Sequence, residues 1–127
     1  MGDVPSDLRY TEEHEWVRIQ GNEVIIGISD FAQNALTEVV WVELPETGTI
    51  VKSMESFGSV ESVKSVSEIY APISGTIVEV NDSLEDAPEQ INDDPYGSGW
   101  ICKIETEGEP DLSGLLNPSE YSVLIGE

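Results

Sequence analysis

The 127-residue sequence lacks most of the residues from which catalytic and metal-binding sites are built. It contains one cysteine and one histidine, so there is no His/Cys cluster to hold a metal and no support for a Ser/His/Asp triad. It also has no glycine-rich phosphate-binding loop. We therefore expect no catalytic residue, no metal, and a protein that does not turn over a substrate by itself.

Basic residues are scarce as well. Five lysines and arginines stand against 26 aspartates and glutamates, which gives a formal net charge of −21. Such a chain repels phosphates and anionic lipid headgroups, which excludes nucleic acid and membrane surfaces as partners. No apolar run is long enough to cross a bilayer. The acidity is compatible with a requirement for solubility alone, and equally with a carrier that meets basic rims on its partner enzymes.

The scarcity of cysteine bears on location. Cys102 is the one thiol, which rules out an internal disulfide, and its alternating apolar surroundings predict a buried position in a strand. The N-terminus has neither a basic region nor an apolar run, so it carries no secretory signal. We expect a bacterial cytoplasmic protein, or a protein of the mitochondrial matrix if the sequence is a processed organellar form.

What the sequence does contain is a series of short segments in which valine and isoleucine alternate with polar residues, separated by glycine and proline turns. This pattern is typical of strands with one buried face, and at this length we expect one domain spanning residues 1–127. The predicted strands are 14–19, 23–28, 38–43, 50–51, 56–63, 66–70, 76–80 and 100–105. The expected fold is mainly β, with short antiparallel strands in two small facing sheets that form a flattened barrel.

Short helices are expected around this β body. One is predicted at residues 31–36, with Ser29 or Asp30 as the N-cap and Gln33 in the capping-box position after Asp30. Another is predicted within residues 83–90. C-terminal helices are predicted over residues 111–125, the first at 111–116 and the second beginning at Asn117 or Pro118.

Lys64 stands at the centre of one of the strand patterns. Two alternating arms approach it from both sides within residues 56–80, as in a hairpin with a tight turn. The tetrapeptide Gly-Thr-Ile-Val occurs at 48–51 and again at 75–78, with Lys64 almost midway between. Lysine contributes little to a hairpin turn, but there it holds an amine far from the body of the domain. We interpret it as a modification target, the alternative being an ordinary solvated lysine.

Several motifs around Lys64 resemble those of a known family. Glu61-Ser62-Val63-Lys64 is similar to the hairpin of lipoyl and biotinyl carrier domains, and it is followed by Ala71-Pro72 and Ser74-Gly75 as in those domains. Further motifs, in order along nearly the whole chain, are similar to those of the glycine cleavage H-protein family: His14-Glu15-Trp16-Val17, Gly27-Ile28-Ser29-Asp30, residues 38–45, Phe57-Gly58, Asp94-Pro95-Tyr96, Gly99-Trp100 and Glu120-Tyr121.

The resemblance implies a fold, a cofactor and partners. The fold is the barrel-sandwich hybrid of lipoyl and biotinyl domains. The cofactor is lipoate in amide linkage to Lys64, with Glu61 and Glu68 as flanking recognition residues. The implied function is a lipoyl-bearing shuttle of the glycine cleavage system, a monomer that carries the aminomethyl group derived from glycine. Its implied partners are glycine decarboxylase (P protein), aminomethyltransferase (T protein), lipoamide dehydrogenase (L protein) and the lipoate-attaching enzymes.

His14-Glu15-Trp16 is the second candidate site. One interpretation is that these are ordinary strand residues, with Trp16 in the core and both polar neighbours in solvent. The resemblance instead implies that Glu15, with His14 beside it, lies in a pocket that receives the loaded arm. A carboxylate there favours the protonated form of an amine, which has no lone pair with which to expel a thiolate. We hypothesise that Glu15, together with Glu68, protects the carried group.

Other functions remain open at this point. The chain is expected to be either a glycine cleavage carrier, a lipoate-relay protein, or a lipoyl or biotinyl carrier of another complex. Biotinyl domains flank their lysine with methionines, whereas here Val63 and Ser65 flank Lys64. An unmodified interaction domain is the alternative from a different class, and a mass measurement separates it from every carrier.

Overall fold

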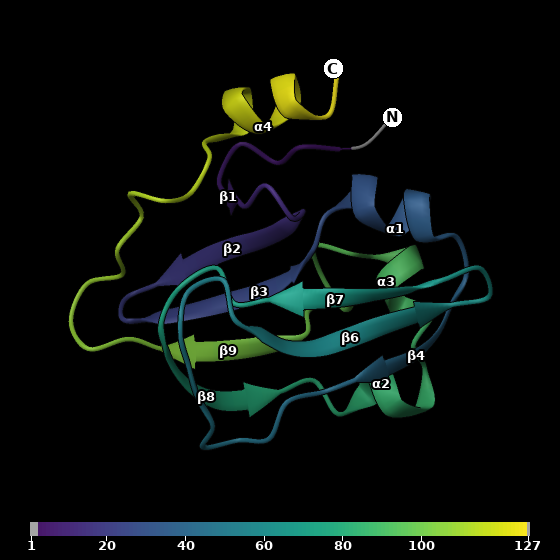
Figure 1. Cartoon of the computed structure of the whole chain (residues 1–127), viewed down its shortest axis with the longest axis horizontal. Coiled ribbons are helices and arrows are strands. Elements are labelled where there is room, and N and C mark those ends of the chain that lie inside the picture. The colour runs from purple at the N-terminus through teal and green to yellow at the C-terminus, as the bar shows by residue number, and fades with distance from the viewer. Residues whose placement is uncertain (1–2, 127) are drawn as a thin grey trace.

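Residues 3–126, which the computed structural model describes, form two antiparallel sheets with short helices at their edges (Figure 1). The larger sheet has the order β1 (Arg9–Tyr10), β2 (Glu15–Gln20), β3 (Glu23–Ile28), β9 (Cys102–Glu105), β8 (Gly75–Val80) and β5 (Ile50–Val51). The smaller has the order β4 (Val39–Glu43), β6 (Ser56–Ser62) and β7 (Val66–Tyr70). The helices are α1 (Asp30–Leu36), α2 (Ser83–Asp86), α3 (Gln90–Asp93) and α4 (Pro118–Leu124).

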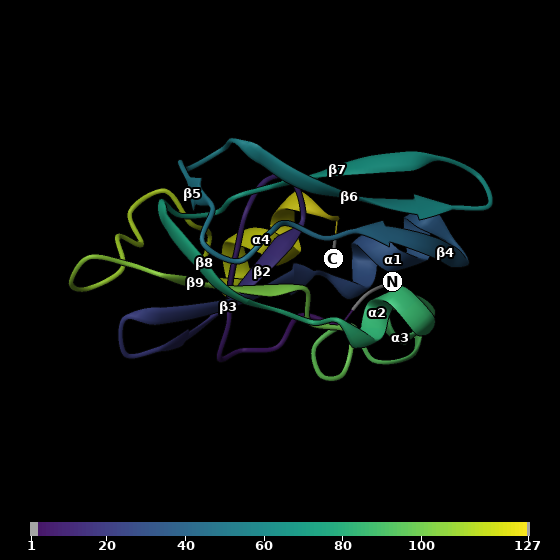
Figure 2. The same cartoon turned by 90° about the horizontal axis from the view of Figure 1, so that it is seen from below.

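The two sheets face one another (Figure 2). The apolar side chains of both fill the space between them. Ile26 and Ile104 come from the larger sheet, Val60 and Ile69 from the smaller, and all four are buried. Cys102 is buried in the same core, and burial raises the pKa of its thiol to about 12. The predicted mainly-β fold is therefore confirmed, as a flattened sandwich that does not close into a full barrel.

A second, smaller core lies on the outer face of the larger sheet. It contains Leu8, Tyr10, Trp16 and Tyr121, which brings the C-terminal helix α4 onto the N-terminal strands. The Trp16 indole N–H donates to the Pro95 carbonyl at 2.9 Å, so its one polar group is satisfied inside this core. No helix within residues 3–126 is long and apolar enough to cross a membrane.

The repeated tetrapeptides lie against each other. Ile50 is opposite Thr76 and Val51 is opposite Gly75, so residues 48–51 and 75–78 form one antiparallel ladder between β5 and β8. The Gly48 N–H donates to the Ile77 carbonyl at 2.7 Å and continues this ladder. The repeat thus joins the two ends of the segment that carries the β6–β7 hairpin.

Gly75 in this ladder has no room for a side chain. A Cβ there would lie 2.5 Å from both the Glu105 carbonyl oxygen and the Ile104 side chain. We expect Gly75→Ala to lower the free energy of unfolding by about 1–3 kcal/mol, the usual range for overpacking. Gly114→Ala is the matched control, because nothing lies within 4 Å of its added Cβ and its φ is not in the left-handed region. Equal stability of the two variants in urea unfolding would contradict this packing.

Helix α1 begins as predicted but with different capping. Ser29 is the N-cap, and its side chain accepts a hydrogen bond from the Ala32 N–H at 3.2 Å. The capping box expected from Asp30 and Gln33 is not formed, because the Gln33 amide donates to the Asp30 carboxylate at 2.7 Å instead. The 83–90 segment contains α2, and α3 follows it without having been predicted.

Of the two C-terminal helices predicted over residues 111–125, the structure contains only α4. The prediction of a helix at residues 111–116 is wrong. There the Asp111 carboxylate accepts from the N–H and hydroxyl of Ser113, which closes a local turn. Leu116 then pairs with Tyr10 through two backbone hydrogen bonds of 2.7 and 3.0 Å. Asn117 follows as the N-cap of α4, in a capping box with Glu120.

Candidate functional site

Lys64 lies in the turn between β6 and β7, as the sequence predicts. Ser62 explains how a lysine fits there. Its hydroxyl oxygen accepts hydrogen bonds from the Lys64 N–H at 3.1 Å and the Ser65 N–H at 3.0 Å, and its own N–H donates to the Ser65 carbonyl at 2.8 Å. The Ser62 side chain thus stabilises the turn, so the turn does not need glycine or asparagine at position 64.

The hairpin tip is tied to the neighbouring segment of the chain. The Val63 N–H donates to the Glu38 carbonyl at 3.1 Å, and the Lys64 ammonium donates to the Ala35 carbonyl at 3.0 Å. Ala35 lies in the last turn of α1, where unpaired carbonyls favour a cation. Figures 1 and 2 both show the tip of the β6–β7 hairpin at the same end of the molecule as α1 and β4.

A cavity of about 390 Å³ opens between this hairpin, α1 and the start of β2. Lys64 lines it, and so do His14, Glu15 and Glu68, so the structure brings together four of the five predicted site residues. The fifth, Glu61, does not line it. The other walls are mostly apolar: Ile28, Phe31, Ala32, Ala35, Leu36, Val60, Val66 and Ile69, with Glu13, Ser65 and Ser67.

Glu15 is the buried carboxyl of this cavity, with 1% of its surface exposed. Its Oε1 accepts from the Thr11 hydroxyl at 2.5 Å and its Oε2 accepts from the Tyr70 N–H at 3.2 Å. Burial raises the pKa of Glu15 to about 7, and these two hydrogen bonds oppose the shift. Glu15 therefore titrates much closer to neutral pH than an exposed glutamate does. The interpretation that it lies in solvent is wrong, whereas the predicted burial of Trp16 is confirmed.

His14 is held in an unusual conformation beside Glu15. Its φ is 75°, in the left-handed region that non-glycine residues seldom adopt. Its Nδ1 lies 2.8 Å from the Tyr121 hydroxyl, and that hydroxyl lies 2.6 Å from Ser29 Oγ. The His14 ring also packs on Phe31, with 4.9 Å between the ring centroids, and burial lowers the pKa of His14. One hydroxyl from α4 thus links the residue before β2 to the N-cap of α1.

Replacing Tyr121 by phenylalanine tests this link. The variant removes the partner of His14 Nδ1 and leaves the buried Ser29 hydroxyl with the Ala32 N–H alone. We expect the free energy of unfolding to fall by about 1–3 kcal/mol. Val123→Ser, on the same helix but with 77% of its residue surface exposed, is the matched control and is expected to change little. A Tyr121→Phe variant as stable as wild type would contradict the bridging role.

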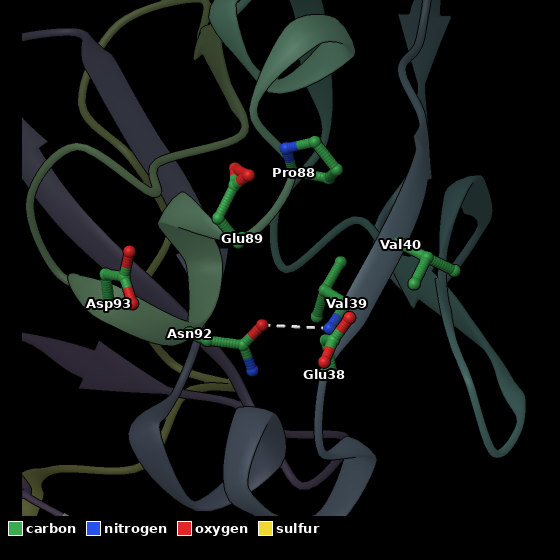
Figure 3. A pocket seen from close by; sticks show the side chains of 7 residues that line it. All are labelled: Glu38, Val39, Val40, Pro88, Glu89, Asn92 and Asp93. Atoms are coloured by element: carbon green, nitrogen blue, oxygen red, sulfur yellow. Dashed lines mark hydrogen bonds between the residues drawn. The ribbon is translucent and has the colours of Figure 1, made fainter.

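A second hollow, of about 680 Å³, lies between β4 and α3 and is bordered by Glu38, Glu89 and Asp93 (Figure 3). The side-chain amide of Asn92, which lines this hollow, makes hydrogen bonds with the protein through both its oxygen and its nitrogen. The Asn92 Oδ1 accepts from the Val39 N–H at 2.8 Å, and its Nδ2 donates to Gln33 Oε1 at 2.9 Å and to the Thr37 carbonyl at 2.7 Å. Asn92 therefore holds β4 against α1 and α3. Within residues 3–126 there is no group of side chains able to hold a metal ion.

Two facing antiparallel sheets with a lysine at the tip of a projecting hairpin define the class of lipoyl- and biotinyl-type carrier domains. Comparison with known proteins narrows this class. Residues 8–127 match the model of the family described as "Glycine cleavage H-protein". The chain belongs to the glycine cleavage H-protein family.

Individual relatives agree with this membership. The chain is 54% identical to the glycine cleavage system H proteins of Anaeromyxobacter sp. (strain K) and of Geobacillus thermodenitrificans (strain NG80-2), over 98% of both chains in each comparison. The crystal structure of a glycine cleavage system H protein from Mycobacterium marinum is similar with a TM-score of 0.90 at 42% identity. That match covers 98% of this chain and 100% of the other. The chain is accordingly a lipoyl-bearing shuttle component of the glycine cleavage system, a carrier and not an enzyme.

Proposed function

We propose that Lys64 carries the lipoyl group in amide linkage and that the cavity beside it receives the end of the arm. The observation that carries this proposal is that Lys64 and the buried Glu15 line one cavity. The arm is a hydrocarbon chain, and the cavity walls contain Ile28, Phe31 and Leu36. Acylation removes the ammonium charge of Lys64, so the modified side chain lies on apolar surface at low desolvation cost.

When bound, lipoate supplies a disulfide that accepts the aminomethyl group derived from glycine and is later regenerated by oxidation. The role of Glu15 follows from its own environment. A cationic amine placed beside Glu15 favours the carboxylate over the protonated form that burial favours, and the carboxylate in turn favours the protonated amine. Burial of Glu15 also keeps water away from the pair. Glu15 thereby protects the carried group during transfer between enzymes.

The remaining predicted residues receive supporting roles in this proposal. His14 shapes the wall next to Glu15, and Glu68 provides a carboxylate at the rim, where it accepts from the Ser56 hydroxyl at 2.6 Å. Glu61 faces away from the cavity and is exposed, which suits recognition by the enzymes that attach lipoate. The proposed partners are the P, T and L proteins and those lipoate-attaching enzymes, visited by a monomer. We place the chain in the bacterial cytoplasm, as its relatives are bacterial.

Reconstitution with purified partners separates this proposal from its alternatives. Lipoylated chain mixed with glycine and a pyridoxal-phosphate glycine decarboxylase is expected to lose its disulfide and release carbon dioxide in step. A lipoylated chain that is reduced only by the decarboxylase of a 2-oxoacid dehydrogenase complex would contradict the proposal. Transfer of its lipoyl group to another carrier, without any glycine-dependent reduction, would identify a lipoate relay instead.

A further inference from the structure

His14 and Glu15 are consecutive residues, yet both line the arm cavity. Successive side chains of a strand point to opposite faces, and the left-handed φ of 75° at His14 breaks that alternation. An arm that reaches Glu15 therefore also meets the His14 ring. The Nδ1 of this ring lies 2.8 Å from the Tyr121 hydroxyl, whereas no hydrogen bond within residues 3–126 reaches Nε2. Nε2 is thus the ring nitrogen with which His14 can bind the arm.

In a neutral imidazole one nitrogen is a donor and the other an acceptor, and the hydrogen bonds around the ring decide which. The Tyr121 hydroxyl lies between His14 Nδ1 and the Ser29 hydroxyl, which is 2.6 Å away. A proton on Nδ1 would be donated to Tyr121, and Tyr121 would then donate to Ser29. The hydrogen of the buried Ser29 hydroxyl would have no acceptor in residues 3–126, which is costly in a buried position.

The opposite direction leaves no group of this chain unsatisfied. The Ser29 hydroxyl donates to the Tyr121 oxygen, and the Tyr121 hydroxyl donates to His14 Nδ1. The Ser29 oxygen still accepts from the Ala32 N–H at 3.2 Å as the N-cap of α1. Burial lowers the pKa of His14, which keeps its ring neutral at neutral pH, as an accepting Nδ1 requires. The proton of the neutral ring then lies on Nε2.

We propose that Tyr121 and Ser29 are positioning residues that fix His14 in its Nε2–H tautomer, so that His14 donates a hydrogen bond to a sulfur atom of the arm. This inference rests on the proposed attachment of lipoate at Lys64 and on the proposed docking of the arm in the cavity. The two adjacent side chains then have different roles. The Glu15 carboxylate accepts from the carried cationic amine, whereas the Nε2–H of His14 has no lone pair and suits an acceptor.

The acceptors on such an arm are its amide carbonyl, at the root, and its sulfur atoms, at the far end. The Lys64 nitrogen already donates to the Ala35 carbonyl at 3.0 Å, and acylation leaves one N–H on this nitrogen to keep that bond. The root of the arm therefore stays at the last turn of α1. The sulfur atoms lie at the end that bears the carried amine, which is the end placed beside Glu15. Because His14 is next to Glu15, a sulfur is its nearest acceptor.

Nitrogen NMR of the histidine ring tests the tautomer directly, since the chain contains one histidine and its ring signals need no further assignment. At about pH 8, where the ring is neutral, we expect a protonated Nε2 and an unprotonated Nδ1. Tyr121→Phe removes the donor to Nδ1, so both tautomers are expected to be populated and the two nitrogen signals to move toward each other. Val123→Ser, on the exposed side of α4, is the matched control and is expected to leave them unchanged. A proton on Nδ1 in wild type, or an unchanged spectrum for Tyr121→Phe, would overturn the proposal.

The contact with the arm is tested on the same signals. The probes are the chain lipoylated and loaded from glycine by the decarboxylase, and the chain octanoylated at Lys64, whose arm has the same amide but no sulfur. We expect the Nε2–H proton signal to shift and to exchange more slowly with water in the loaded chain alone. An equal change in the octanoylated chain, or no change in either, would overturn the proposal. A chain that gains no lipoyl group at Lys64, or that is not loaded from glycine, would instead refute the proposed function itself.

Discussion

Replacing Lys64 by arginine is expected to abolish arm attachment and glycine-dependent turnover while leaving the fold intact. A guanidinium stays protonated at any pH the protein tolerates, so it is not acylated where an amine is. The Lys64 side chain is exposed, and its hydrogen bond to the Ala35 carbonyl is one that an arginine N–H also makes. We expect the free energy of unfolding to change by less than about 0.5 kcal/mol.

The assays for this variant are intact mass after incubation with the lipoate-attaching enzymes, and carbon dioxide release with the glycine decarboxylase. Lys52→Arg is the matched control, because Lys52 is also exposed but lies near β5, away from the hairpin. It is expected to behave as wild type in both assays. A Lys64→Arg protein that still gains mass would show that the arm is attached elsewhere.

Replacing Glu15 by glutamine is expected to shorten the lifetime of the loaded carrier about tenfold, the equivalent of one pKa unit in the protonation of the carried amine. The amide is neutral and does not favour a nearby cation, although its Oε1 still accepts from the Tyr70 N–H. The measurement is the loss of the loaded mass with time at neutral pH.

Glu13→Gln is the control for this experiment. Glu13 also lines the cavity, but its side chain is exposed, so solvent screens its charge. We expect its loaded form to decay at nearly the wild-type rate. Identical decay of wild type and Glu15→Gln would remove the protective role of Glu15, whereas equal acceleration in both variants would point to total charge and not to the buried carboxyl.

Glu15→Gln is also expected to change how the free energy of unfolding depends on pH. The folded-state pKa of Glu15 is about 7, above its usual value of 4.5, so the folded chain holds this proton more tightly than the unfolded chain. The stabilising contribution is complete below about pH 4.5 and is lost as the pH rises through about 7. The slope is at most about 1.4 kcal/mol per pH unit.

Because Glu15→Gln has no proton to lose in this range, its stability relative to wild type is expected to increase from pH 4.5 to pH 7. Urea unfolding of both proteins across this range measures the difference, and the other carboxylates contribute equally to both. A difference that does not change with pH would mean that Glu15 is not buried as the structure has it.

Strand patterns gave good predictions here because every strand has at least one face in a hydrophobic core. β3, β5 and β7 have their predicted bounds, and the other predicted strands differ by one or two residues. The Lys64 turn and the burial of Trp16 and Cys102 also followed from local alternation. These features depend on residues close together in sequence, which is the information that periodicity contains.

Other features depend on contacts that the sequence does not reveal locally. Residues 111–116 have a helix-like composition, yet Leu116 pairs with Tyr10 and the segment forms a turn. The role of Tyr121 arises from a hydroxyl that meets His14, 107 residues away. Ser62 is a local signal for the Lys64 turn, since a serine two residues before a turn lysine can accept its N–H.

The central claim is that Lys64 bears the arm, and intact mass with peptide fragmentation tests it most directly. The protein is produced in cells supplied with lipoate and having active lipoate-attaching enzymes. We predict a single lipoyl-sized increment confined to the peptide that contains Lys64. The chain has two other lysines, Lys52 and Lys103, and an increment on either of them, or no increment at all, would contradict the account.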